Sequence, residues 1–199
     1  MKHSLPRFTV AAVLAAGLVV LGGCATSYVV DNNVQAFSSL AGIPAQPTYR
    51  FERLPSQQEP GQAQVEAMAD AALNQAGLRR DDAAPRYTVQ VSGRINRILS
   101  PWSDPRDAFF GAGFGWGRRG HMGMGLGLGY PADPPWFHRE VSVVVRELGT
   151  AKVVFESHAT HDGPWVDNTA VFPAMFAAAM QGFPQPPVGP RRVDVAVPS

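Results

Sequence analysis

The alternation of apolar and polar positions is clearest between residues 139 and 158. Valine occupies positions 141, 143 and 145, Gly149-Thr150 follows as a turn, and the alternation resumes at Val153 and Phe155. A period of two is typical of strands that bury one face. The pattern therefore predicts a β-hairpin with strands over 139–148 and 151–158.

Shorter stretches with the same period predict further strands. They cover residues 48–54, 87–95 and 192–197, and the pattern also allows a short strand over 34–40. Residues 62–76 have the helical spacing instead, because apolar side chains recur every three or four residues from Val65 onward.

The two helix predictions rest on end signals as well as on spacing. Gly77 stands where a residue in the left-handed conformation would end the first helix. A second helix is predicted from about residue 169 to residue 181, with Asp167 or Asn168 as its cap and Gly182 after its end. Pro173 is tolerated only near a first turn, which would place the start of this helix later than the cap.

These elements follow one another as strand, helix, strand, hairpin, helix and strand. Each has one apolar face, and both helices packed on one side of a mainly antiparallel sheet would bury all these faces together. The sequence therefore predicts an α+β fold, a two-layer sandwich. We expect the domain to span residues 48–199 and to carry a glycine-rich loop insertion at about 101–137.

The first 23 residues have the three parts of an export signal. Lys2 and Arg7 supply positive charge, an apolar run extends from Phe8 to Leu21, and Gly22 and Gly23 follow. The apolar run is shorter than the about 20 residues that a membrane-spanning helix needs. Residues 1–23 are therefore predicted to be a signal peptide.

Cys24 is the only cysteine of the chain and directly follows Leu21, Gly22 and Gly23. This string resembles the lipobox of bacterial lipoproteins, in which small residues let the signal peptidase reach the bond before the cysteine. The resemblance implies acyl chains on the Cys24 thiol and on the new amino terminus, enough to anchor the protein stably to a lipid bilayer. Residues 24–47 would then form a lipidated tether. A buried core cysteine behind an ordinary signal peptide is the alternative.

The residues after the cleavage site bear on location and partners. Ala25 follows the cysteine, which by the enterobacterial sorting rule indicates the outer membrane, with the domain facing the periplasm. Loss of Lys2 and Arg7 turns the balance of 17 basic and 16 acidic residues into a net charge of −1. So small a charge gives no electrostatic reason to expect a nucleic acid as partner.

Six short strings along the chain can be compared with known families. They are Phe37-Ser38-Ser39-Leu40, Thr48-Tyr49-Arg50-Phe51, Ala76-Gly77-Leu78, Tyr87-Thr88-Val89, Lys152-Val153-Val154-Phe155 and Gly182-Phe183-Pro184. Together they resemble a family of Gram-negative lipoproteins, domain of unknown function 4136, over most of residues 28–187. The resemblance implies an α+β fold and an envelope lipoprotein, and it brings no catalytic residues to assign.

The string GWGRRG at 115–120 matches the G-x-G-x-x-G of dinucleotide-binding proteins. That fingerprint requires a helix directly after the glycines. Here Gly120 precedes a segment in which every second residue from Gly123 to Gly129 is glycine, and each glycine costs a helix about 1 kcal/mol relative to alanine. We therefore expect no nucleotide and no other cofactor.

The same glycine-rich stretch alternates glycine with apolar side chains on both sides of Arg118-Arg119. In an extended conformation, each arm would show apolar side chains on one face and bare backbone on the other. Two interpretations stay open: a loop excluded from the core, and a hairpin that packs on the domain, on another copy or on anionic lipid. The candidate contact residues are Phe114, Trp116, Arg118, Arg119, Met122, Met124, Leu126 and Leu128.

Candidate chemistry elsewhere in the sequence is sparse. His158, His161 and Asp162 are close in sequence, but residues three apart on a strand point to opposite faces, and no metal site is predicted. No G-x-S-x-G or S-x-x-K string occurs. The hairpin is expected to present a charged face, with a pair of catalytic carboxylates as the alternative. That face would consist of Glu140, Glu147, Glu156, Arg139, Arg146 and Lys152.

The sequence therefore predicts a non-enzymatic lipoprotein that binds an envelope protein or another envelope component. The alternative is a diverged periplasmic hydrolase with a site near His158, His161 and Asp162. A concave pocket that brought two of these residues, or one of them and Asp167, within hydrogen-bond range would favour the hydrolase. A flat sheet face at this place would favour the binding module.

Overall fold

The computed structural model describes residues 27–102, 112–116, 122–126 and 135–198. Val29–Val197 forms one unit, and Met1–Tyr28 with Pro198–Ser199 forms another. In chain order the elements are β1 Ser27–Ser38, β2 Thr48–Phe51, the 3-10 turn η1 Pro55–Gln57, α2 Gly61–Gln75, β3 Arg79–Arg80, β4 Tyr87–Ile98, β5 Ala112–Trp116, β6 Met122–Leu126, β7 Trp136–Glu147, β8 Val153–Gly163, α3 Asn168–Met180 and β9 Arg191–Pro198.

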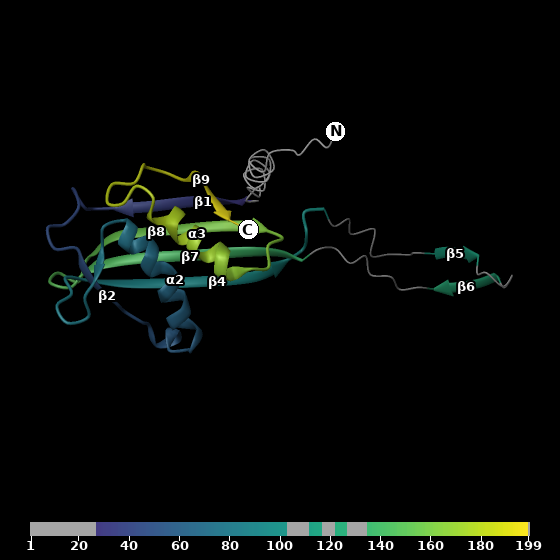
Figure 1. Ribbon diagram of the computed structural model, residues 1–199, viewed down its shortest axis with the longest axis horizontal. Coiled ribbons are helices and arrows are strands. Elements are labelled where there is room, and N and C mark those ends of the chain that lie inside the picture. The colour runs from purple at the N-terminus through teal and green to yellow at the C-terminus, as the bar shows by residue number, and fades with distance from the viewer. Residues whose placement is uncertain (1–26, 103–111, 117–121, 127–134, 199) are drawn as a thin grey trace, which may run out of the picture. The chain divides into compact units, whose positions relative to one another are not determined.

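Seven of the strands form one mixed sheet in the order β3-β2-β4-β7-β8-β1-β9 (Figure 1). The pairs β4–β7, β7–β8 and β1–β8 are antiparallel, whereas β2 pairs in parallel with both β3 and β4. Helix α3 packs on β7 and β8, and α2 packs on β4 and on α3. The fold is therefore α+β, as the sequence predicts.

The predicted hairpin is confirmed as β7 and β8, and both strands are longer than the sequence pattern indicates. Val141, Val143 and Val145 are all buried, and Phe155 continues the buried face on β8. The prediction is wrong for Val153, which is 42% exposed. A register shift between Val145 and Arg146 interrupts the alternation just where Val153 pairs.

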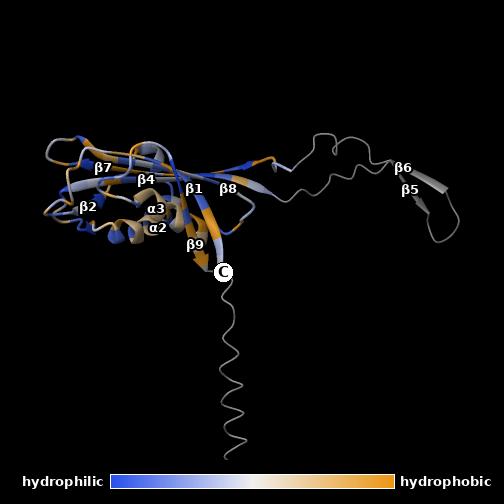
Figure 2. Ribbon diagram, turned by 90° about the horizontal axis from the view of Figure 1, so that it is seen from above, coloured by the Kyte–Doolittle hydropathy of each residue, from blue (hydrophilic) through white to orange (hydrophobic). Residues whose placement is uncertain are grey.

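Burial alternates along β7 and β8, so the sheet has two unlike faces. Odd-numbered residues of these strands lie on the face that carries the helices, which we call the covered face. Even-numbered residues lie on the other, which we call the open face. Figure 2 shows the sheet from its edge, with α2 and α3 on one side of β4 and β7 and no helix on the other.

Helix α2 begins at Gly61, one residue before the predicted start, and it ends as the glycine at position 77 predicts. Gly77 has a φ of +92°. Its N–H donates to the Asn74 carbonyl, and the Leu78 N–H donates to the Leu73 carbonyl, which is the hydrogen-bond pair of a Schellman motif. Leu78 and Leu73 are fully buried, so the motif also closes an apolar contact at the helix end.

Helix α3 begins directly after the predicted cap, because the Asp167 carboxylate accepts a hydrogen bond from the Thr169 N–H. Pro173 therefore lies inside the helix rather than near its first turn, contrary to the later start that its position suggests. The helix is buried on nearly all sides, as the positions of Val171, Met175 and Phe176 at 0% exposure indicate. Such a helix takes its stability from tertiary packing.

Two polar contacts join the β2 strand and the residues after it to α2. The buried Tyr49 hydroxyl donates to Asp70, and burial raises the pKa of Tyr49 far above its usual range, with Asp70 adding to the shift. Arg53 makes a two-pronged ion pair with Glu66, at 2.6 and 2.8 Å, and the hydrogen bonds to Glu66 raise the pKa of Arg53. Glu66 is 5% exposed, and the pair with Arg53 supplies the hydrogen bonds that a buried polar group requires.

Strand β1 extends the domain toward the N-terminus. The prediction places residues 24–47 in a tether, with a short strand allowed over 34–40, whereas β1 pairs with β8 from Asn33 to Ser38 inside the sheet. Its side chains Val30, Val34 and Ala36 are buried in the core. The tether can therefore include only residues before this strand.

The glycine-rich stretch contains a two-stranded antiparallel sheet of β5 and β6, in which Phe114 pairs with Met124 and Trp116 with Met122. The pairing shows the extended arms that the alternation predicts, and the packing of such a hairpin on the domain, on another copy or on lipid stays a prediction. Ala112 pairs with Leu126, so apolar positions stand opposite each other in register. Arg118, Arg119 and Leu128 lie outside the described residues. In the described part of the chain, none of the helices is both long and apolar enough to cross a membrane.

We expect Gly77→Ala to lower the free energy of unfolding by about 1 kcal/mol, because a side chain is strained at positive φ. No atom lies within 4 Å of a Cβ added at Gly77 or at Gly149, so neither substitution causes a clash. Gly149, which lacks the positive φ, is the matched control, and Gly149→Ala should be neutral or slightly stabilising. Urea unfolding of both variants checks this, and equal effects would contradict it.

Candidate binding surface

The open face is formed by polar side chains that pair across β4, β7 and β8. Ser92 and Ser142 lie opposite each other, with their hydroxyl oxygens 2.7 Å apart. Arg94 stands opposite Glu140 in the next row toward the end of β4. Cross-strand polar pairs of this kind stabilise a solvated sheet face and leave it smooth.

His158 lies at the centre of this face between two carboxylates. Its Nε2 atom is 2.8 Å from Glu156, and its Nδ1 atom is 3.8 Å from Glu140. All three side chains are about 40% exposed. The cluster is therefore an exposed hydrogen-bonded group on a sheet face.

A second histidine and carboxylate pair lies nearer the end of the same face, where His138 Nδ1 is 2.5 Å from Asp162. His161 belongs to the other face. Its side chain is 1% exposed, and its Nδ1 is 2.8 Å from the Asp31 carbonyl oxygen and 3.2 Å from the Asp31 carboxylate. His161 therefore points to the face opposite His158 and Asp162, as residue spacing on a strand predicts. In the described ranges, no three His, Cys, Asp or Glu side chains are placed to hold a metal.

A groove of about 540 Å³ opens along the outer edge of β4 and is continuous with the open face. Gln90, Ser92 and Ser142 contribute to it from the sheet. The side-chain amides of Gln57 and Gln62 close its other side, because each donates a 2.9 Å hydrogen bond to the Val91 carbonyl. The groove therefore extends the open face beyond β4 and adds a concave region to an otherwise flat surface.

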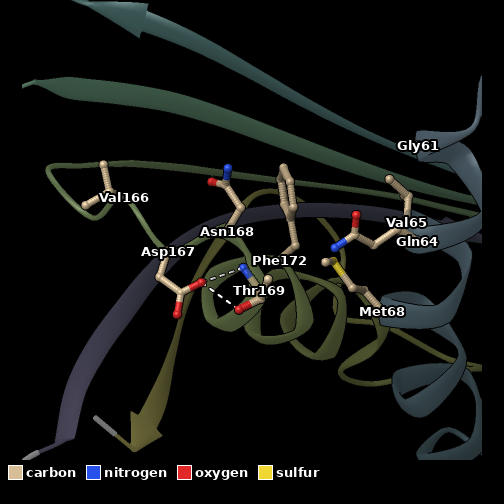
Figure 3. Close-up of a pocket in the computed structure, with 9 residues that line it drawn as sticks. All are labelled: Gly61, Gln64, Val65, Met68, Val166, Asp167, Asn168, Thr169 and Phe172. Atoms are coloured by element: carbon tan, nitrogen blue, oxygen red, sulfur yellow. Dashed lines mark hydrogen bonds between the residues drawn. The ribbon is translucent and has the colours of Figure 1, made fainter.

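A separate pocket of about 410 Å³ lies between the first turns of α2 and α3 (Figure 3). Val65, Met68 and Phe172 supply apolar walls, and Gln64 and Asn168 supply amide groups. Its volume is within the range of small-molecule sites. Asp167 is the titratable residue in its lining, beside uncharged polar and apolar groups.

Asp167 is the one titratable residue in that lining, and its carboxylate is engaged in capping. It accepts hydrogen bonds from the Thr169 hydroxyl at 2.6 Å and the Thr169 N–H at 2.8 Å. These hydrogen bonds, the one from the hydroxyl above all, lower the pKa of Asp167. Asp167 is therefore a structural residue of α3, and it forms no hydrogen bond with His158 or His161 among those of the described residues.

The predicted charged face of the hairpin is partly wrong. Arg139 lies on the covered face and is fully buried. Its Nε donates to Asn168 at 3.0 Å, another N–H donates to the Trp165 carbonyl, and the guanidinium lies 5.0 Å from the Phe137 ring. The physical reason is parity, because Arg139 has the odd numbering of the valines that follow it.

The other charged residues of that prediction separate into two groups. Glu140, Glu156 and Arg146 lie on the open face by their even numbering. Glu147 instead accepts from Thr150 at 2.9 Å and from Arg86 at 3.3 Å, and these hydrogen bonds, that of Thr150 first, lower its pKa. The three glutamates therefore do not form one site, and only two of them flank His158.

Several predicted sites lie outside the described residues, namely Leu21, Gly22, Gly23, Cys24, Arg118, Arg119 and Leu128. The contact candidates at 114, 116, 122, 124 and 126 lie on β5 and β6. Sequence reasoning missed the buried pair of Arg53 and Glu66 and the groove beside β4. The signal that could have revealed the pair is Glu66 itself, a charged residue whose spacing from Ala69 and Leu73 places it on the buried side of α2.

The described chain is thus an α+β domain with one helix-covered and one open sheet face, and its ionisable groups do not converge in a pocket. The family profile described as a domain of unknown function (DUF4136) matches residues 32–185. The chain belongs to this family, as the sequence strings indicate. No curated protein matches the chain.

Two solved structures are similar to the chain at 13% identity. One is a PDZ domain protein from Parabacteroides distasonis, with a TM-score of 0.50, 99% of this chain covered and 45% of that chain. The chain therefore spans less than half of that protein, and the likeness concerns the fold alone. The other is the PelC dodecamer from Paraburkholderia phytofirmans, with a TM-score of 0.44, 75% of this chain covered and 94% of that chain.

We expect Arg139→Met to lower the free energy of unfolding by about 2 kcal/mol, because it removes the hydrogen bonds that the buried Arg139 guanidinium donates to the Trp165 carbonyl and to Asn168. Arg139→Lys should not restore stability, since one ammonium cannot reproduce the guanidinium fork. The control is Arg146→Met on the open face of the same strand, with an expected change within about 0.5 kcal/mol. Denaturant titration of the three variants measures this, and a similar loss for Arg146→Met would refute the assignment of faces.

Asp167 should make stability depend on pH in a defined direction. Its pKa is lower in the folded state than in the unfolded state, so its contribution is present above the unfolded pKa of about 3.9 and is lost as pH falls through the folded value. Asp167→Asn keeps a capping oxygen but cannot titrate. The melting temperature of the wild type should therefore fall relative to Asp167→Asn between about pH 4 and pH 2. A difference that stays constant over this range would disprove the role.

Proposed function

We propose that this protein is a lipid-anchored, non-enzymatic binding module of the Gram-negative cell envelope. In this proposal residues 1–23 are removed as a signal peptide, and Cys24 carries acyl chains that hold the protein at the outer membrane. The domain faces the periplasm and binds an envelope protein or another envelope component. The proposal takes no nucleotide, nucleic acid or cofactor.

The observation that carries the proposal is the open face. It extends across β4, β7 and β8, no helix packs on it, and its side chains are paired polar groups such as Ser92 with Ser142. A surface of this kind suits a partner that docks on a flat face, and the groove beside β4 adds local shape. The two helices then serve as the second layer of a two-layer, mainly antiparallel sandwich that supports the face from behind.

The hydrolase alternative would place a site near His158, His161 and Asp162. Catalysis by these groups needs them within hydrogen-bond reach of one another or of one substrate atom. His161 lies on the covered face with Asp31, and Asp162 pairs with His138. This arrangement gives the hydrolase no support, so we favour binding.

Site-specific photo-crosslinking in living cells tests the proposal. A photoreactive amino acid at Ser142 or Thr160, on the open face, should yield a discrete crosslinked product with one envelope partner. The matched control positions are Ala67 and Ala71, which are exposed on α2. The control positions should give no such product, and equal products from both sets would contradict binding at the open face.

The anchor is tested on the same protein purified from its native host. Intact-mass measurement should find residues 1–23 absent and fatty acyl groups on Cys24. Replacement of residues 1–24 by an ordinary cleavable signal peptide without the cysteine should move the protein from the membrane fraction to the soluble periplasmic fraction, because the product carries no acyl chains. Detection of the unmodified Cys24 thiol in the wild type would refute lipidation.

A further inference from the structure

One end of the sheet gathers large exposed apolar side chains. Ile98 is the last residue of β4, and Leu99 and Trp102 come just after the strand. Their exposed fractions are 38%, 85% and 82%. Trp165 and Val166 follow from the end of β8, at 37% and 72%. We call these five residues the tryptophan end. Exposed residues of this size on one surface mark an interaction site.

The antiparallel pairing brings four strand ends together at this place. Ile98 of β4 pairs with Trp136 of β7, and Phe137 pairs with Gly163 at the end of β8. Strand β1 enters at the same end, because its Asn33 pairs with Thr160 and its Asp31 contacts His161. Neighbouring strands lie about 4.8 Å apart, so the four ends from β4 to β1 span about 14 Å.

The position of β1 restricts where an anchor can be. Val29, which enters the unit at this end and is 52% exposed, follows Cys24 by five residues. A chain of five residues reaches at most about 17 Å when fully extended. If Cys24 is held in a bilayer, as the proposed function states, Val29 must therefore lie within that distance of the lipid surface, and it brings the neighbouring strand ends of the tryptophan end toward the lipid.

The composition of the end suits a lipid headgroup region. Tryptophan is enriched at the membrane interface, where its ring is amphipathic, and arginine beside it can contact anionic headgroups. Arg94 and Arg97 are exposed on β4 next to the tryptophan end. Of the acids near this end, Asp31 lies 3.5 Å from Arg192, Asp162 contacts His138, and Asp167 caps α3.

We propose that the tryptophan end contacts the phospholipid bilayer directly, so that the domain stands on the membrane with this end down. This inference rests on the proposed anchor at Cys24, and it goes beyond it by naming the surface that meets the lipid. The opposite end of the sheet, with the turn between β7 and β8 at Leu148, then points away from the membrane.

Fluorescence quenching by brominated lipid tests this contact with the full lipidated protein. One variant keeps Trp165 as its sole tryptophan, with Phe at 102, 116 and 136, and a second keeps only Trp102. The control variant has Phe at all four native positions and carries Leu148→Trp at the far end, where Leu148 is 39% exposed. Each is reconstituted in phosphatidylethanolamine and phosphatidylglycerol vesicles, with and without bromine on the acyl chains.

We expect brominated lipid to reduce emission of Trp165 and Trp102 about twofold, as for side chains in the membrane interface, and to leave the L148W signal unchanged. Equal quenching at both ends, or none at Trp165 and Trp102, would overturn the inference.

Intact mass of the same samples separates the membrane contact from the anchor at Cys24. Lipidated protein without quenching refutes only this contact, and unlipidated protein refutes the anchor, whereas quenching in unlipidated protein still supports the contact. Circular dichroism of each variant confirms the fold.

Discussion

The structure depends on burial of one face of the sheet by α2 and α3. Alternate residues of a strand point to opposite faces, so the valines that pack on the helices fix the direction of every residue between them. Val89, Val143 and Phe155 therefore commit Gln90, Ser142 and other even-numbered residues to the open face. A slip of one residue would expose the valines, which makes the polar surface a direct consequence of the core.

Local signals in the sequence predict an element well where a single residue determines where that element begins or ends. Gly77 ends α2 because few other residues adopt its positive φ, and Asp167 begins α3 because its carboxylate satisfies a free N–H. The hairpin of β7 and β8 follows from alternation alone. The resemblance of short strings to the family is confirmed by the match over residues 32–185.

What the sequence could not predict depends on contacts between distant residues. Arg139 is hydrophilic in isolation, and only its partners near residue 165, brought close by the end of β8, make its burial tolerable. The alternation of β1 is broken by a buried polar residue, Asn32, and by two exposed apolar residues, Val29 and Phe37. Its place inside the sheet depends on pairing with β8, 117 to 127 positions away. The contact of Arg53 with Glu66 likewise joins two elements whose packing has no local signal.

The open face and the tryptophan end are compatible in a single orientation. Strands that end at the bilayer must run roughly along the membrane normal, so the open face stands upright and remains accessible from the side. The twelve residues of β7, at about 3.3 Å each, extend about 36 Å from the membrane surface. A partner that lies along the membrane could therefore reach Glu140 and His138 near the base, while one that extends deeper into the periplasm would meet Val144 and Arg146. The short span from Cys24 to Val29 keeps the β1 end of the sheet close to the lipid in this proposal, since five residues reach at most about 17 Å.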